Sequence, residues 1–325
     1  MRAAYYERTG KAADVLVVGA IETPAPAPGE VLVRLHASGV NPSDVKARAG
    51  ARGMPFPRIV PHSDGAGIIE AVGGGVPRER IGERVWIWNG QWQRASGTAA
   101  THIALPAAQA VPLPDRVPFE QGACLGIPAL TAHACVFSDG PVTGRHVLVT
   151  GGAGAVGTLA VRMAKAGGAR VIATASSPSQ AARATRAGAD VIVNHRSADF
   201  AGELRQAVGA TPLDRVVEVE FGANIGIVAD SLAPHAVIAA YGSAAVPQPQ
   251  VPFYPLMFKG VTLRMIIVYL LPDAPRRAAI ADIDAWLRGG ALAPEVDATF
   301  PLDQVVAAHE AVERGGRLGS VIVTP

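Results

Sequence analysis

The sequence predicts an α/β protein that combines a β-rich region with a doubly wound parallel sheet. Three observations support this prediction. Residues 146–168 read as a strand, a glycine turn and an alanine-rich helical segment in succession. From about residue 121, strand and helix patterns alternate, which is typical of βαβ units. Before residue 120, short apolar runs are separated by Pro/Gly clusters, which favours a β-rich region.

The composition indicates a protein with a large core and no polyanionic partner. The 325 residues are 49% hydrophobic and 17% charged, and the formal net charge is +2 without a basic run, so neither nucleic acid nor an anionic membrane is indicated. The first fifteen residues are too polar for a signal peptide, and the apolar run 265–271 is too short to span a bilayer. Cys124 and Cys135 are expected to be free thiols in the core. We therefore expect a cytoplasmic protein.

The β-rich region is expected to contain at least four strands, with a stiff loop at the Pro/Gly cluster 24–29. The predicted strands cover residues 1–6, 30–40, 67–72 and 83–88.

The second half of the chain alternates strands with helices, which predicts a parallel sheet with right-handed crossovers. The predicted strands cover residues 146–150, 170–174, 190–193, 214–218, 235–240 and 261–268. The predicted helices cover residues 154–167, 178–187, 198–208 and 223–232.

The final segment leaves this alternation and is expected to return to the first domain. It is predicted to form a helix at 275–289, a strand at 297–300, a helix at 302–314 and a strand at 320–323. The predicted domains are therefore 1–122 completed by 270–325, and 123–269.

The glycine turn matches the G-x-G-x-x-G pattern at Gly152, Gly154 and Gly157. The three glycines suit a tight turn, close approach of backbone to a pyrophosphate, and close packing of helix on strand. The helix that follows offers free N–H groups to phosphate, so the residues expected to hold the pyrophosphate are Gly152, Ala153, Gly154, Ala155 and Val156. The alternative is a structural turn that binds no nucleotide.

Several stretches together resemble the zinc-independent, zeta-crystallin-like quinone oxidoreductases of the medium-chain dehydrogenase/reductase superfamily. These stretches are residues 39–44, 62–73, 126–132, 152–157, 188–190, 194–196 and 241–243. The resemblance covers essentially the whole chain. It implies a GroES-like catalytic domain, a Rossmann nucleotide-binding domain, a cleft between them and NADPH as the hydride donor.

The same resemblance implies that the protein has no metal site. Related alcohol dehydrogenases with catalytic zinc carry a cysteine where this chain has Asn41, and a histidine where it has Ser63. Zinc needs three or four suitably placed ligands. His62 with Asp64 is expected to be a hydrogen-bonded pair rather than a metal site.

The residues expected near the adenosine ribose favour NADPH over NADH. The second predicted strand of the Rossmann fold ends at Ser176 without the carboxylate that usually binds the ribose hydroxyls of NAD. Ser176 can donate a hydrogen bond, and Arg183 or Arg186 can supply charge, although both arginines also suit a solvated helix face. The family often has a lysine that matches Gln180 and a tyrosine or histidine that matches His195, so the histidine is present and the lysine is missing.

The resemblance also implies residues that surround the nicotinamide and its ribose. They are Thr131, Asn224, Tyr241, Gly242 and Ser243, with Ile267 and Tyr269 near the carboxamide.

On the substrate side, the residues expected to act are Asn41 and Asp44. Without a metal, the acceptor must already be electrophilic, as quinones and activated enones are. The Asn41 amide can stabilise the developing oxyanion and Asp44 can orient it, although Asn41-Pro42 also suits simple turn chemistry. Lys46 stands where the family often has a tyrosine, and His62 lies nearby.

Three of the four tryptophans lie within residues 86–92. Trp88 and Trp92 can form an aromatic wall for a flat quinone, or they can pack against the body of the domain.

These observations favour an NADPH-dependent quinone oxidoreductase that uses no metal. An enone or enoyl reductase and a non-catalytic NADPH-binding protein are the alternatives. The apolar strand predicted at 261–268 is expected to be an edge strand that pairs with its copy in a homodimer. The sequence leaves open the physiological acceptor, one- or two-electron transfer, and dimer or tetramer.

Overall fold

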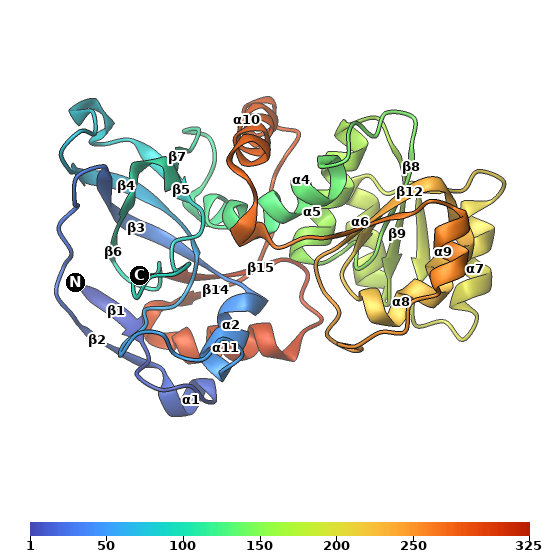
Figure 1. Cartoon of the computed structure of the whole chain (residues 1–325). Helices are drawn as coiled ribbons and strands as arrows, with labels where there is room; N and C mark the ends of the chain where they lie inside the picture. The colour runs from blue at the N-terminus through green and yellow to red at the C-terminus, as the bar shows by residue number, and fades with distance from the viewer. The chain divides into compact units, whose positions relative to one another are not determined.

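The computed structural model describes residues 1–325 and divides into two compact units, whose elements are labelled in Figure 1. Unit 1 comprises Met1–Ile127 and Ala293–Pro325, and unit 2 comprises Pro128–Leu292. The predicted domain limits at residues 122 and 269 stay a prediction. They differ from the limits of the units mainly in the segment 270–292, which lies in unit 2.

Unit 1 is built on a seven-stranded sheet and a separate two-stranded sheet. Its strands are β1 (Arg2–Tyr5), β2 (Val17–Ala20), β3 (Glu30–Val40), β4 (Asp64–Val72), β5 (Arg84–Ile87), β6 (His102–Pro106), β7 (Ala110–Pro112), β14 (Val296–Pro301) and β15 (Ser320–Thr324). The order in the large sheet is β14-β15-β3-β4-β5-β7, and β6 also pairs with β3. Side chains at residues 30–36 of β3 alternate between partly buried and buried positions, as expected for a strand with one face on a core, and residues 37–40 are all buried.

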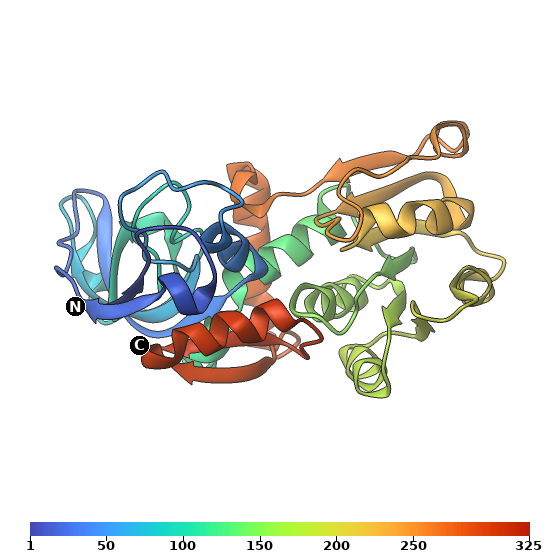
Figure 2. The same cartoon turned by 90° about the horizontal axis from the view of Figure 1, so that it is seen from below.

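The helices of unit 1 lie around a hydrophobic cluster that includes residues of β1 and β15. They are α1 (Ala12–Val15), α2 (Pro42–Ala49), α3 (Phe119–Gly122) and α11 (Val305–Arg314). The apolar face of α11, with Val305, Ala308 and Val312, packs with residues of β1 and β15. Figures 1 and 2 show α11 beside α2, and β15 pairs with β3, so residues near the end of the chain complete the core that the first residues begin.

Unit 2 is a six-stranded parallel sheet with helices between successive strands, which confirms the predicted doubly wound fold. Its strands are β8 (His146–Val149), β9 (Arg170–Ala175), β10 (Val191–Asn194), β11 (Leu213–Glu218), β12 (Leu232–Ala240) and β13 (Thr262–Met265). Its helices are α4 (Leu130–Phe137), α5 (Ala155–Ala166), α6 (Pro178–Ala187), α7 (Phe200–Val208), α8 (Phe221–Val228), α9 (Phe253–Phe258) and α10 (Asp273–Gly289).

The strand order of unit 2 is β10-β9-β8-β11-β12-β13, so it reverses between β8 and β11. In open α/β sheets, ligands bind beyond the carboxyl ends of the strands at this reversal. The glycine turn follows β8, and therefore lies at the expected place.

Some elements differ from their predictions. The predicted helix at 223–232 ends at Val228, and the predicted strand at 261–268 is only Thr262–Met265 long. Residues Leu125–Ala129 form a π-helical turn that contains Pro128, which the sequence did not suggest. No helix has the length and apolar character needed to span a membrane.

Candidate functional site

The glycine turn of unit 2 contains two glycines that packing requires and one that it does not. A Cβ on Gly152 would lie 2.7 Å from the Cβ of Ala173, and a Cβ on Gly157 would lie 2.1 Å from the carbonyl oxygen of Gly151. These two positions are closed by packing within the protein. Gly154, the N-cap of α5, has no such neighbour, because its nearest atom would be 3.4 Å away. Space is therefore kept open at the helix N-terminus, as a bound pyrophosphate would need.

The residues predicted near the adenosine ribose lie at the end of β9 and on α6. The backbone N–H and the hydroxyl of Ser176 both donate to Gln180 Oε1, at 2.9 and 2.8 Å. Arg183 is only 4% exposed and donates from Nε to the Thr158 hydroxyl at 3.2 Å, so a solvated helix face does not describe it. Arg186 is exposed, and so is His195, which follows β10.

A buried carboxyl group that sequence reasoning missed lies at the strand reversal. Glu218, at the end of β11, is 2% exposed and accepts hydrogen bonds from Thr150 Oγ1 at 2.8 Å, Asn224 Nδ2 at 2.9 Å and the Glu220 backbone N–H at 2.6 Å. Burial raises its pKa, and these donors oppose that rise. One amide hydrogen of Asn224, a predicted cofactor residue, is thereby given to Glu218, which leaves the second hydrogen and the amide oxygen for a ligand. The signal in the sequence was an acid at a strand end.

The loops that follow β11 and β12 are joined through Ser243 and Glu220. The Ser243 hydroxyl accepts from Gly222 N at 2.9 Å and donates to Val246 O at 2.6 Å, while the Glu220 carboxylate accepts from the N–H groups of Ala244 and Ala245. The predicted cofactor residue Ser243 therefore orders the loop.

The close approach of these two loops also explains Gly242. A Cβ on Gly242 would lie 2.3 Å from the carbonyl oxygen of Val219.

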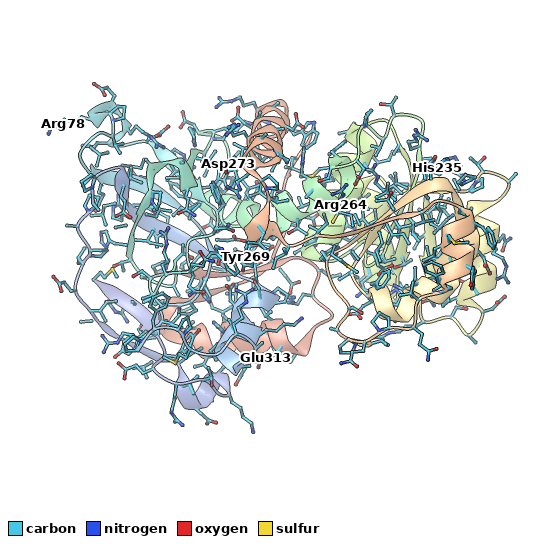
Figure 3. All side chains as sticks on the ribbon, in the orientation of Figure 1. Arg78, His235, Arg264, Tyr269, Asp273 and Glu313 are labelled. Atoms are coloured by element: carbon cyan, nitrogen blue, oxygen red, sulfur yellow. The ribbon has the colours of Figure 1, made fainter.

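The other predicted nicotinamide residues also lie in unit 2. Thr131 is buried in α4, and Tyr241 directly follows β12. Tyr269, labelled in Figure 3, is buried in the short turn after β13, whereas Ile267 is 47% exposed.

In unit 1, Asp64 forms the hydrogen bond that holds the side chain of the predicted catalytic residue Asn41. Its Oδ2 accepts from Asn41 Nδ2 at 2.8 Å, and its Oδ1 accepts from the Ile127 backbone N–H at 2.8 Å. A Cβ on Gly126 would lie 2.2 Å from Asp64 Oδ1, so the π-helical turn passes directly over this carboxyl. Asn41 is also the N-cap of α2, and its backbone N–H donates to Asp44 Oδ2 at 2.7 Å.

Burial decides the charge of these two carboxyl groups. Asp44 is 4% and Asp64 0% exposed. Burial raises the pKa of Asp44 to about 7, against hydrogen bonds from the backbones of Asn41 and Ser63, and raises the pKa of Asp64 well above its usual value. At neutral pH the pair therefore carries less negative charge than its formal count.

The remaining predicted substrate residues are distributed over unit 1. Lys46 is exposed on α2. Trp88 is 9% exposed and donates from Nε1 to Ala108 O at 3.2 Å, which is the geometry of the packing alternative. Trp92 is partly exposed, and the guanidinium of Arg52 lies 5.2 Å from its ring. His62 is fully buried, so it has no surface of its own for a substrate.

The chain contains no group of three or more His, Cys, Asp or Glu side chains placed to hold a metal ion. Where zinc-dependent relatives were expected to carry ligands, unit 1 has the hydrogen-bonded pair Asn41–Asp64 and the buried Ser63.

Comparisons with known proteins agree with this arrangement. The family model "Alcohol dehydrogenase GroES-like domain" matches residues 27–115, and the model "Zinc-binding dehydrogenase" matches residues 155–284. A quinone oxidoreductase of Pongo abelii is 30% identical over 311 residues, which cover 93% of this chain and 91% of that protein. The chain belongs to the quinone oxidoreductase family of medium-chain dehydrogenases/reductases.

Solved structures of this family superimpose on the whole chain. A mycobacterial protein in complex with NADPH is 29% identical with a TM-score of 0.89, and it is covered completely, as is this chain. A quinone oxidoreductase of Pseudomonas syringae is 28% identical with a TM-score of 0.88, and 99% of it is covered.

Proposed function

We propose that this protein reduces quinones with NADPH and without a metal ion. The observation that carries the proposal is the match to quinone oxidoreductases over 93% of the chain, together with the NADPH bound by a mycobacterial neighbour. The proposal is also supported by Gly154 at the N-terminus of α5, where no protein atom crowds the backbone that would approach a pyrophosphate.

Unit 2 contains the residues that would hold the cofactor. The turn 152–156 would bind the pyrophosphate, Ser176 the adenosine side, and Asn224 the nicotinamide ribose. When bound, NADPH supplies the hydride. Glu218 would orient the Asn224 amide, because it accepts one of the two amide hydrogens and so turns the amide oxygen away from the Glu218 carboxyl group.

Unit 1 contains the residues that would act on the quinone. An amide nitrogen carries two hydrogens. One hydrogen of Asn41 is given to Asp64, and the Asn41 side chain also hydrogen-bonds to Asp44. We propose that the quinone oxygen replaces Asp44 as the acceptor of this second hydrogen as negative charge develops on it. The hydroquinone anion then takes one proton from water, so that one hydride and one proton are added in total. Asp44, bonded to the Asn41 backbone, would hold the amide in place.

We further propose that activity is independent of zinc. The Asn41–Asp64 hydrogen bond occupies the position where a zinc ligand set would be needed. Metal analysis of the purified protein should find no stoichiometric zinc, and chelators should leave turnover unchanged. Chelator-sensitive turnover would contradict this proposal.

A cytoplasmic location and a homodimer complete the proposal. Cys124 and Cys135 are buried and form no disulfide, which suits a reducing compartment. Cell fractionation tests the location. The homodimer is supported by apolar side chains exposed on the edge strand and the adjoining helix. They are Phe253, Tyr254, Met257, Phe258, Leu263 and Met265.

The decisive assay follows NADPH oxidation in the presence of a panel of quinones and enones. Turnover with quinones supports the proposal. Turnover with enones alone would favour an enone or enoyl reductase, and binding of NADPH without any turnover would favour a non-catalytic binding protein.

Asn41→Ala is the first variant to measure. Loss of one oxyanion donor commonly costs about a hundredfold or more in turnover, whereas NADPH affinity should hardly change because Asn41 lies in unit 1. Val45→Ala is a matched control, since Val45 is a buried residue of the same helix with no polar group. Wild-type kinetics in Asn41→Ala would show that the quinone binds elsewhere.

A further inference from the structure

A pair of buried histidines joins the start of β4 to the C-terminal helix α11. His62 Nε2 lies 2.9 Å from His309 Nε2, and both side chains are 0% exposed. The rings stack with centroids 5.1 Å apart, although 247 positions separate the residues in the chain. His62 has a φ of +76°, a left-handed conformation that costs a non-glycine residue about 1–3 kcal/mol. Such a residue persists only where its surroundings hold it, and here the surroundings are polar.

A chain of hydrogen bonds continues from His62 through two hydroxyl groups. His62 Nδ1 lies 2.8 Å from Ser38 Oγ, which lies 2.8 Å from Thr98 Oγ1. Thr98 Oγ1 lies 2.5 Å from the backbone carbonyl oxygen of Asp64. Ser38 and Thr98 are both fully buried, so their hydroxyl groups have no access to solvent and must form hydrogen bonds with these neighbouring residues.

Counting the protons fixes the direction of every bond. A carbonyl oxygen can only accept, so the single hydroxyl proton of Thr98 goes to Asp64. Ser38 must then donate to Thr98, and His62 Nδ1–H must donate to Ser38. A neutral imidazole with its proton on Nδ1 accepts at Nε2, so His309 Nε2–H must donate to His62.

The same count explains the one ring nitrogen of the histidine pair that has no partner. His309 Nδ1 is buried and has no hydrogen-bond partner. In this scheme it carries a lone pair rather than an N–H. Burial and the nearby Arg48 guanidinium lower the pKa of His309 to about 3, and burial with His309 as neighbour lowers the pKa of His62, so both rings stay neutral. Arg48 itself pairs with Glu313 on α11, which is labelled in Figure 3.

The hydrogen-bond chain ends at Asp64, the residue that binds the Asn41 side chain. The carbonyl oxygen of Asp64 receives the last proton, and its carboxyl group accepts from Asn41 Nδ2. Ser63, between His62 and Asp64, donates its backbone N–H to Asp44. The turn 62–64 thus places both carboxyl groups that hold Asn41.

We propose that His309 is a positioning residue whose Nε2–H begins a one-directional hydrogen-bond chain, through His62, Ser38 and Thr98, that fixes the turn 62–64 and so aims Asp64 at Asn41. The hydrogen-bond chain stands on geometry alone, and its effect on turnover rests on the proposed function.

The first test reads the tautomers directly. In ¹⁵N NMR spectra of the full protein near neutral pH, His62 should be neutral and protonated at Nδ1, and His309 neutral and protonated at Nε2. The variants His62→Gln and His309→Gln assign the signals by removing one set each. The reverse tautomers, or an imidazolium at either position, would overturn the proposal whether or not the protein is active.

The second test compares three variants on α11. His309→Phe keeps a ring but removes the donor, and should lower kcat for quinone by about tenfold or more, since small misplacements of catalytic groups cost factors of this order. His309→Gln places an amide N–H near the position of Nε2 and should recover most of the loss. Both should bind NADPH within about twofold of wild type.

Val305→Ala, a buried apolar change on the same helix, controls for lost stability and should keep the wild-type kcat. Equal kcat in His309→Phe and wild type would overturn the positioning role. A wild-type protein that reduces no quinone would instead contradict the proposed function, and the tautomers would still decide whether the hydrogen-bond chain exists.

Discussion

Asp44 lies buried at the N-terminus of α2, and its raised pKa makes the stability of unit 1 depend on pH. Its pKa is about 7 in the folded protein and about 3.9 in an unfolded chain. Between these values the folded protein binds more protons than the unfolded chain. The contribution of Asp44 to the free energy of unfolding therefore falls as the pH rises from about 4 to about 7, and is constant above that.

Asp44→Asn should remove this part of the pH dependence. Urea unfolding of the variant and the wild type at about pH 5 and about pH 7.5 gives the free energy of unfolding at each pH. The change between the two pH values should be smaller in the variant. Asp190→Asn is the control. Although burial raises the pKa of Asp190, the Val171 N–H and Lys165 lower it overall, so its transition lies below this window. If Asp44→Asn kept the wild-type change in the free energy of unfolding with pH, Asp44 would be ionised in the folded protein over the whole range.

Gln180 occupies the donors that a 2′-phosphate would use. We predict tighter binding of NADPH than of NADH, because no carboxylate ends β9. Gln180→Lys should sharpen this preference, since it replaces the acceptor of both Ser176 hydrogen bonds with a cation. Fluorescence titration of both nucleotides gives the dissociation constants.

Gln180→Leu separates the effect of freeing the Ser176 donors from the effect of adding a positive charge, because it releases Ser176 without adding charge. Equal affinities of the wild type for NADPH and NADH would show that the missing lysine outweighs the missing acid.

At the scale of single residues, the candidate site residues that could be predicted were those that belong to short sequence motifs. The glycine turn was indicated by its pattern between a strand and a helix, and Asn41 and Asp44 were indicated mainly by the family resemblance. Glu218 and His309 were missed because their partners come from other elements. His309 pairs with a residue 247 positions away, and no local pattern predicts such a contact.

Among the elements, β13 is an edge strand of the parallel sheet in which all four residues are exposed. Such a strand invites pairing with another copy. Met265, 66% exposed, and Phe258, 81% exposed, contribute apolar surface beside this edge. We predict that Met265→Glu yields monomers, because pairing about a two-fold axis would bring two buried carboxylates together.

Light scattering at micromolar concentration measures the mass. Ile81→Glu is the matched control, since Ile81 is an exposed apolar residue of unit 1 and its change should leave a dimer intact. A wild-type protein that is already monomeric would remove the proposed dimer.

Most elements were predictable because their hydrophobic patterns are long and regular. The helix predicted at 178–187 matches α6 in both limits. Short elements were not, and β7 with its three residues has too little pattern to be seen. The π-helical turn at Leu125–Ala129 depends on the carboxyl of Asp64, which lies far away in sequence.

For the whole molecule, the order of units along the chain matters. Unit 2 is continuous, whereas unit 1 needs Ala293–Pro325. We predict that a chain ending at Leu292 keeps slow amide exchange in unit 2 and loses it in unit 1, because β15 no longer covers the edge of β3 and α11 no longer covers the core.

Hydrogen exchange followed by mass spectrometry measures both units at once. A chain shortened by Pro325 alone is the control, since this residue lies outside β15. Retained protection throughout residues 1–127 of the shortened chain would show that the first segment folds without the last.

The discontinuity of unit 1 also has a consequence during translation. Residues 1–127 are synthesised before unit 2, yet β15, one of the three strands that pair with β3, is synthesised after it. The nascent N-terminal segment must therefore wait, with an open strand edge and an uncovered apolar cluster, while the whole of unit 2 is synthesised and folds. An open edge of this kind is where chains aggregate. We therefore expect residues 1–127 to reach their native structure only after unit 2 has been synthesised.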